Sequence, residues 1–323
     1  MFRSIAAACA ALALAAGPVA AQEYPTKPIS LMVPFAAGGP TDTVARSLAL
    51  AMGKSLKQTV IVENVPGAGG TIAPTKLKGA APDGHALLIA HIGMSTAPAL
   101  YRALPFKPLE DFELVGEVVD VPMTLIAKKD MPAKDFKELL AYIKANKEKV
   151  TLANAGIGSA SHLCGLLLMS AIQTELTTVP YKGTAPAIND LLGGQVDLLC
   201  DQTTNTTSYI VSGRVKAYGA TSKTRLATMK ELPTLAESGL PGFEVAVWHG
   251  VYAPKGTPKP VVDKLVAALQ TAIADPAFVL KMNELGSQVV AKDKATPDGL
   301  RTRLKSEIDK WTPVIRKAGI YAD

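Results

Sequence analysis

The hydrophobic pattern of this chain alternates short apolar runs with segments in which apolar residues recur every three or four positions. Residues 31–33 form an apolar run, and after a loop of small residues Val44, Leu48, Ala51 and Met52 fall on one face of a helix. Further apolar runs at residues 59–62 and 85–90 are also separated by a short helical segment. Strands that alternate with helices predict parallel βαβ units with right-handed crossovers, and therefore an α/β fold.

The first loop, residues 35–42, combines small residues with a helix start. Gly38 and Gly39 leave the backbone open to close approach, and we expect Thr41 or Asp42 to cap the following helix. Unpaired N–H groups and the positive end of the helix dipole then point at one spot. The motif predicts a binding site for an anionic group.

The same order of elements occurs a second time, starting near residue 150. A strand is followed by the small-residue loop 155–162 and an apolar helix, and a later strand, residues 195–200, ends in the polar loop that begins at Asp201 and Gln202. Two lobes with the same winding place these loops opposite residues 35–42, at the carboxyl ends of the strands, where ligands bind in such sheets. We expect each lobe to be a βαβ sheet flanked by helices, with the ligand in the cleft between the lobes.

Two extended segments, residues 112–128 and 239–251, are the expected crossings between lobes. The first holds two apolar runs broken by Pro122. We therefore assign residues 22–121 and 248–323 to lobe 1 and residues 122–247 to lobe 2. Few crossings permit rigid-body closure of the lobes around a solute.

Residues 1–21 have the pattern of a secretory signal peptide. Arg3 precedes an uncharged stretch rich in Ala and Leu, which ends at Val19-Ala20-Ala21 and is too short for a comfortable membrane span. The mature protein is thus expected to be exported, to the periplasm.

Cys164 and Cys200 remain after Cys9 leaves with the leader. One begins a buried helix and the other ends a strand of the same lobe, so they are either bonded or plain packing residues.

Charge and composition narrow the class of ligand. The whole chain carries a formal net charge of +6, and removing Arg3 with the leader leaves +5. Because there are no basic runs and only 5% of residues are aromatic, nucleic-acid and sugar binding are disfavoured. A mildly basic surface suits solubility and attraction of small acidic molecules.

The predicted ligand contacts come from the loops that face the cleft. We expect an acid group to rest on backbone amides of residues 35–41 and 159–162. The candidate set is Phe35, Ala36, Ala37, Gly39, Thr41, Asp42, His91, Gly93, Ser159, Ala160, Ser161, His162, Lys182, Gly183, Asp201 and Gln202.

Several of these residues have a structural alternative. His91 and His162 either contact the ligand or are hydrogen-bonded within the scaffold, and Lys182 is either a counter-ion or a solvated side chain. Asp42 suits capping better than contact with an anion, which it would repel. Asp201 at a strand end could receive a ligand ammonium, which favours an amino acid over a plain diacid. The four histidines lack metal-ligand spacing, and no motif predicts a metal or a cofactor.

The ordered motifs of the mature chain resemble those of the Bug family, the extracytoplasmic (TctC) solute receptors of tripartite tricarboxylate transporters. They are Tyr24-Pro25-Thr26-Lys27-Pro28-Ile29, Val33-Pro34-Phe35-Ala36-Ala37-Gly38-Gly39-Pro40-Thr41-Asp42, Glu63-Asn64-Val65-Pro66-Gly67-Ala68-Gly69-Gly70, Ala81-Pro82-Asp83-Gly84, Val179-Pro180-Tyr181-Lys182-Gly183, Leu192-Gly193-Gly194-Gln195-Val196-Asp197 and Ala253-Pro254-Lys255-Gly256-Thr257-Pro258.

The resemblance implies a two-domain periplasmic binding protein that closes on a carboxylated solute and works with the membrane components of a transporter. We expect the protein to be a monomer. The resemblance also implies that the loops matching residues 35–42 and 156–162 hold the ligand carboxylate through backbone amides and bridging water. The polar stretch 200–207 looks like the subgroup that includes an aspartate receptor, which favours a dicarboxylate or an acidic amino acid.

Two other function classes compete with transport. An exported α/β enzyme acting on a carboxylate is weakened because Gly156-x-Gly158-x-x-Ser161 lacks the third glycine of a dinucleotide fingerprint. Ser159 and Ser161 likewise lack the flanking glycines of a nucleophile elbow. A receptor that feeds a two-component sensor is not distinguished from an uptake receptor by the sequence.

Overall fold

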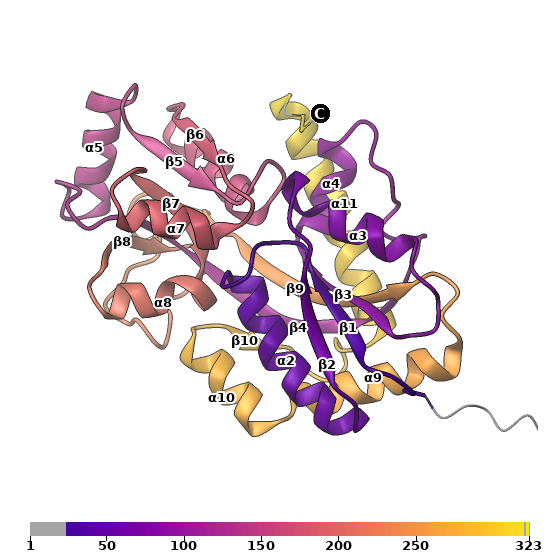
Figure 1. Cartoon of the computed structure of the whole chain (residues 1–323). Helices are drawn as coiled ribbons and strands as arrows, with labels where there is room; N and C mark the ends of the chain where they lie inside the picture. Colours follow the sequence, from indigo (N-terminus) through magenta and orange to yellow (C-terminus); the bar gives the residue numbers. More distant parts are fainter. Residues whose placement is uncertain (1–23, 320, 323) are drawn as a thin grey trace, which may run out of the picture.

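The chain folds into two α/β lobes, as the computed structural model of residues 24–319, 321 and 322 shows (Figure 1). The proposed signal peptide lies outside the described residues. Two strands, β4 (Phe112–Lys128) and β9 (Ala246–Pro254), run from one lobe towards the other and pair antiparallel along most of their length.

Lobe 1 has a mixed sheet in the order β2-β1-β3-β9-β4. The strands β1, β2 and β3 are parallel, and β9 and β10 pair antiparallel with their neighbours. The strand β1 is apolar and almost fully buried, as expected for a parallel strand covered on both faces. The other elements of this lobe are β2 (Val60–Asn64), β3 (Ala86–His91), β10 (Gln288–Val289), α2 (Pro40–Leu56), η1 (Ala68–Gly70), α3 (Ile72–Lys78), α4 (Gly93–Leu100), α9 (Lys259–Ile273), α10 (Pro276–Glu284) and α11 (Pro297–Ala318), with β1 at Ile29–Val33.

Lobe 2 repeats the plan with three parallel strands beside antiparallel ones. The strand β7 (Leu198–Gln202) is buried throughout and lies between β5 and the second half of β4. The other elements of this lobe are α5 (Phe136–Asn146), β5 (Thr151–Asn154), α6 (Ala160–Ile172), β6 (Thr177–Pro180), α7 (Thr184–Leu192), α8 (Thr203–Val211) and β8 (Val215–Ala220).

The predicted break at Pro122 is wrong, because β4 is one continuous strand. Pro122 is the last residue paired with β9, and Met123 is the first paired with β7. A missing N–H is tolerated where the partner strand changes. The change of partner lies at the proposed boundary. The division into residues 22–121 with 248–323 and residues 122–247 stays a prediction.

Two helices that the sequence analysis did not predict begin directly after buried strands. The helix α4 follows His91, and α8 follows Gln202, so Asp201 and Gln202 belong to β7. Glycine, threonine and asparagine are poor helix formers, so helix propensity does not predict either helix. The first five residues of α8 are buried, and this tertiary packing overrides their low helix propensity.

No single helix in the described part of the chain is long and apolar enough to cross a membrane, although the bent pair α9 and α10 meets the criteria of length and composition together.

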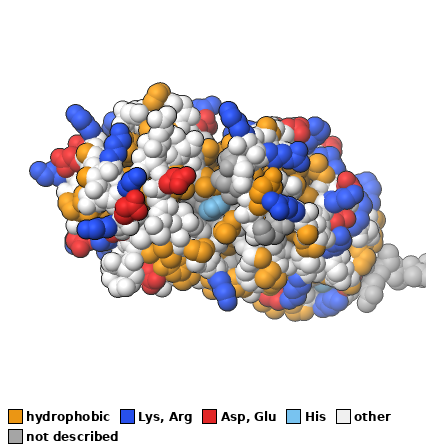
Figure 2. Space-filling view, turned by 90° about the horizontal axis from the view of Figure 1, so that it is seen from above, with side chains coloured by type: hydrophobic (Ala, Val, Ile, Leu, Met, Phe, Trp, Pro, Cys, Tyr) orange, Lys and Arg blue, Asp and Glu red, His pale blue; other side chains and the backbone are white. Residues whose placement is uncertain are grey.

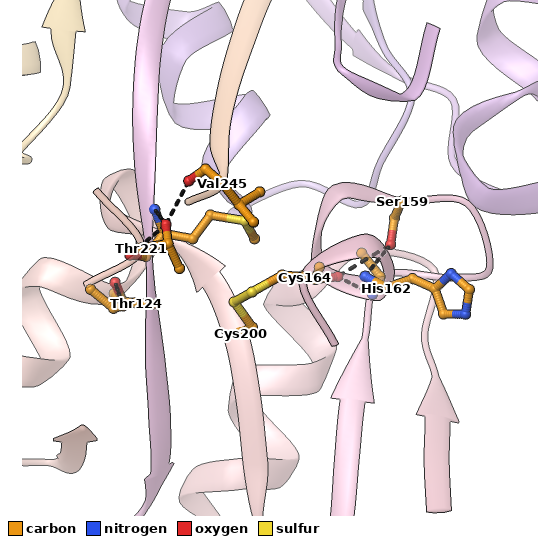
Figure 3. The surroundings of a disulfide bond; sticks show 11 residues. Thr124, Ser159, His162, Cys164, Cys200, Thr221 and Val245 are labelled. Carbon is orange, nitrogen blue, oxygen red and sulfur yellow. Dashed lines mark hydrogen bonds between the residues drawn. A yellow bond between two sulfur atoms is a disulfide. The ribbon is translucent and has the colours of Figure 1, made fainter. Parts of the chain in front are cut away.

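A disulfide bond joins Cys164 in α6 to Cys200 in β7 (Figure 3). Their Cα atoms are 6.1 Å apart, and both residues are buried. The bond ties the helix that follows the loop 155–162 to the strand that ends at Asp201 and Gln202. It therefore fixes two segments of lobe 2 that face lobe 1.

We expect loss of this bond to destabilise the protein by about 3 to 4 kcal/mol, because closing a loop with a sequence separation of 36 restricts the unfolded chain. Urea unfolding of Cys164→Ala/Cys200→Ala measures the loss, and the reduced wild type should match the variant. Thiol titration of the protein from Gln22 onward, unfolded without reductant, should find no free thiol. Two free thiols would contradict the bond.

Candidate functional site

A small cavity lies between the lobes. Seen from above, a histidine side chain is visible where the two halves of the molecule meet (Figure 2). The cavity is lined by Phe35, Pro40, Thr41 and His91 of lobe 1 and by Ala155, Ser159, Ala160, Ser161, Thr184, Asp201 and Gln202 of lobe 2. A neighbouring cavity shares Phe35 and His91 and also contacts Gly93.

Helix N-termini from both lobes converge on this cavity. The first residues of α2, α6 and α7 line it, and α8 begins directly after Gln202. The cap residues of α2, α7 and α8 make no side-chain capping bond, so first-turn N–H groups of these helices are left for other acceptors. Because no Lys or Arg lines the cavity, an anion bound there would be held by helix dipoles and N–H groups.

The loop 35–42 offers fewer free amides than the sequence predicted. The Ala36 N–H donates to the Lys182 carbonyl at 3.0 Å, which joins the two lobes. The Gly38 N–H donates to Asp42 Oδ2 at 2.9 Å. These two amides are therefore used within the protein.

Asp42 does not cap α2, and Thr41 does not either, because the N-cap residue is Gly39. The buried Asp42 carboxylate instead accepts hydrogen bonds from Arg46 at 2.8 and 3.0 Å and from Asn64 Nδ2 at 2.9 Å. Burial opposes ionisation, but the bonds from Arg46, Gly38 and Asn64 together hold the pKa of Asp42 below its usual value. Asp42 thus shapes the loop as a carboxylate.

The loop before α6 is held by its own polar side chains. Ser159 caps the helix by accepting from the His162 N–H (Figure 3), and Ser161 Oγ accepts from the Ala155 N–H at 2.7 Å. His162 Nδ1 accepts from the Gly158 N–H at 3.2 Å, and burial lowers the pKa of this histidine. Of these residues Ser159 and Ser161 line the cavity, whereas the His162 ring is engaged within the loop.

His91 is neutral and presents one donor. Its Nδ1 accepts from the Gly93 N–H at 3.0 Å, which assigns the proton to Nε2. Burial lowers the pKa of His91 to about 4. The ring stacks on Phe35 with centroids 4.9 Å apart and meets His249 edge-on at 5.8 Å.

His249 lies behind the cavity wall, and the sequence analysis did not predict it as a site residue. It is fully buried, and its Nε2 lies 3.3 Å from Thr41 Oγ1, which orients a hydroxyl that lines the cavity. Burial and the neighbouring His91 hold the pKa of His249 well below its usual value.

The end of β7 contributes acceptors. Asp201 Oδ2 accepts from Asn205 Nδ2 at 2.6 Å, and the residue is 1% exposed. Burial raises the pKa of Asp201 to about 6, against the hydrogen bond from Asn205 and the nearby Gln202 N–H and Thr184 hydroxyl, which lower it. Gln202 Oε1 is buried and has no hydrogen-bond donor among the described residues.

The remaining predicted residues lie outside this cavity. Lys182 is exposed and lines a separate groove with residues 67–69 and Tyr101. Ala37 is exposed, and Gly39 and Gly183 are the cap residues of α2 and α7. Pro40, Ala155 and Thr184 were missed, although Thr184 directly follows the predicted Gly183 and starts its helix. No group of three or more His, Cys, Asp or Glu side chains that could hold a metal occurs in the described ranges.

Direct contacts hold the lobes together around the cavity. Besides the Ala36 to Lys182 bond, the Tyr101 hydroxyl lies 2.8 Å from the Ala68 carbonyl of lobe 1 and 3.0 Å from the Ile157 carbonyl of lobe 2. Thr207 of α8 donates to the Leu285 carbonyl at 3.2 Å. The structure is therefore a closed conformation.

Comparison with known proteins gives one consistent family. The sequence profile described as "Tripartite tricarboxylate transporter family receptor" (TctC) matches residues 44–320. A relative from Agrobacterium vitis, a UPF0065 protein in the TAR-I ttuE-ttuC' intergenic region, is 48% identical, and the match covers 93% of this chain and 87% of the relative.

Two solved structures have the same fold over nearly their whole length. The periplasmic binding protein BugD is 56% identical with a TM-score of 0.91, and the match covers 92% of this chain and 99% of BugD. MatC from Rhodopseudomonas palustris, solved with bound malate, is 40% identical with a TM-score of 0.87, and the match covers 90% of this chain and 100% of MatC.

Asp42→Asn should destabilise the protein at pH 7 by about 1.5 to 3 kcal/mol, because hydrogen bonds to a buried carboxylate are lost and a new N–H group faces Arg46. The folded-state pKa of Asp42 lies below its usual value of 3.8, so the carboxylate contributes its full stabilisation above pH 3.8. This stabilisation is lost as the pH falls through the folded-state pKa. Urea unfolding measures the difference. Asp298→Asn, an exposed aspartate in the first turn of α11, is the matched control and should change stability little. Equal effects of the two substitutions would contradict this role of Asp42.

Proposed function

This protein belongs to the tripartite tricarboxylate transporter receptor family, and on that basis we propose that it captures a small dicarboxylate or acidic amino acid and delivers it to the membrane components of such a transporter. As a member of this family it is a periplasmic solute-binding receptor. We further propose that the leader, residues 1–21, directs export, and that the mature protein acts as a non-catalytic monomer.

The observation that carries the proposal is the convergence of helix N-termini from both lobes on a cavity without Lys or Arg. Such a site attracts acid groups through N–H donors and helix dipoles. Since donors come from both lobes, a ligand with an acid group at each end would bridge them and favour closure. Malate, bound to the related MatC, is a small acid of this class.

The lining of the cavity supports a small solute. Phe35 stacked on His91 closes one side with aromatic surface, which limits the length of the bound molecule.

A thermal-shift screen of mono-, di- and tricarboxylates, acidic amino acids, aromatic acids, neutral sugars and cations tests the proposal. We expect small dicarboxylates or acidic amino acids to raise the melting temperature, because a ligand at 100 times its dissociation constant stabilises by about 2.7 kcal/mol. If only sugars or cations raised it, the proposed anion site would be wrong.

Closure can be tested without altering the cavity. A Cβ added to Gly69 of lobe 1 would lie 1.8 Å from the Ile157 carbonyl of lobe 2, so Gly69→Ala should prevent full closure. With the dicarboxylate that the screen identifies, we expect at least tenfold weaker binding and, by small-angle scattering, a larger radius of gyration than the liganded wild type. Gly194→Ala is the matched control, because this glycine also has a positive φ but faces open space. Closure is contradicted if Gly69→Ala binds and scatters as the wild type does.

A further inference from the structure

One wall of the cavity differs chemically from the others. The first turns of α2, α6 and α7 present N–H donors, whereas the end of β7 presents the Asp201 carboxyl group and the side-chain amide of Gln202, whose Oε1 has no donor among the described residues. A buried acceptor without a donor is costly. A ligand with acid groups alone has nothing to donate to this wall, whereas an ammonium group has three donors.

The charge on Asp201 is not set by another charged side chain. The half of β4 that pairs with β7 ends at Lys128, which pairs with Asp197 at 2.8 Å. The helix α6 carries His162, which is bonded to Gly158, and α7 carries Asp190, which accepts from Tyr181. Across the cavity lies His91, which is neutral. The neighbours that touch the carboxyl group are uncharged: Asn205, Thr184 and the Gln202 N–H. The bound ligand therefore supplies the nearest charge.

We propose that Asp201 selects between two ligand classes through its own protonation: as a carboxylate it accepts the ammonium group of an acidic amino acid, and as a neutral acid it donates a hydrogen bond to a carboxylate of a plain diacid. This inference rests on the carboxylate-receptor function proposed above and adds the residue that chooses among carboxylates. Two carboxylates brought together in a buried site share a proton, which makes the neutral form the one compatible with a plain diacid.

The direction of the pH dependence follows from the site. Burial raises the pKa of Asp201 to about 6 in the empty cavity. An ammonium ligand requires the ionised form, so its affinity falls as pH drops through this value. With a pKa of about 6 the ionised fraction changes about tenfold between pH 7 and pH 5, which is the expected change in affinity. For a plain diacid the protonated form binds, so the dependence on Asp201 has the opposite sign.

Calorimetric titration of the protein from Gln22 onward with L-aspartate and with succinate tests this, because the two probes differ only by the ammonium group. Binding is measured from pH 5 to pH 8 for the wild type and for Asp201→Asn. The ratio of their affinities at each pH cancels the ionisation of the probe itself. The asparagine keeps the shape of the side chain but cannot ionise. Asp130→Asn, which makes the same change at an exposed site of lobe 2, is the matched control.

At pH 7 we expect Asp201→Asn to weaken aspartate binding by about 10- to 100-fold, as for loss of a hydrogen bond to a charged group. The ratio of wild-type to variant affinity should rise about tenfold from pH 5 to pH 7 for aspartate and fall over the same range for succinate. Asp130→Asn should give a ratio near one throughout.

A ratio independent of pH for both probes would overturn the inference while leaving the receptor function intact. If circular dichroism shows that Asp201→Asn does not fold, the wild-type profiles decide: aspartate and succinate affinities that change with pH in parallel, beyond what the ionisation of each probe explains, contradict the role of Asp201. If neither these probes nor any other carboxylate of the screen binds, the receptor proposal itself fails, and this inference fails with it.

Discussion

The constraint on which the proposed site depends is that an anion would have to be held in a closed, buried cavity without a cationic side chain. A buried charge is stable only if donors surround it. Here the donors are backbone N–H groups at the starts of helices, which cannot move away or lose their polarity with pH. The architecture follows from this, since each of these helices is placed by a strand that delivers its N-terminus to the cleft.

The side chains around the site hold the backbone in place. Asp42 fixes the loop before α2 through Gly38 and Arg46, and Ser159 and Ser161 do the same for the loop before α6. His91 and His249 are neutral because they are buried, so they act as hydrogen-bonding groups of fixed charge. A site built in this way discriminates by geometry and by the few acceptors at the end of β7.

The sequence predicted the two-lobed α/β fold and the loops that face the cleft, because strand periodicity and glycine-rich turns are local signals. It missed α4 and α8, whose residues favour helix only once they are buried. It also misassigned Asp42, because the N-cap position shifted to Gly39 and the carboxylate found Arg46 and Asn64 instead. His249 could not be found from local pattern, since its partner Thr41 is 208 residues away.

The position of β9 in the first sheet has a consequence for how the chain acquires its fold. This strand lies between β3 and β4, yet it follows the whole of lobe 2 in the sequence. A chain that emerges N-terminus first from an export channel therefore has all of lobe 2 available before the sheet of lobe 1 can be joined. Lobe 2 is an uninterrupted segment with its own disulfide, so it is able to fold as a unit before β9 pairs with β3. Until β9 inserts, the edge of β3 stays unpaired, and that interval is when an exported chain of this design is most exposed to aggregation and to proteases.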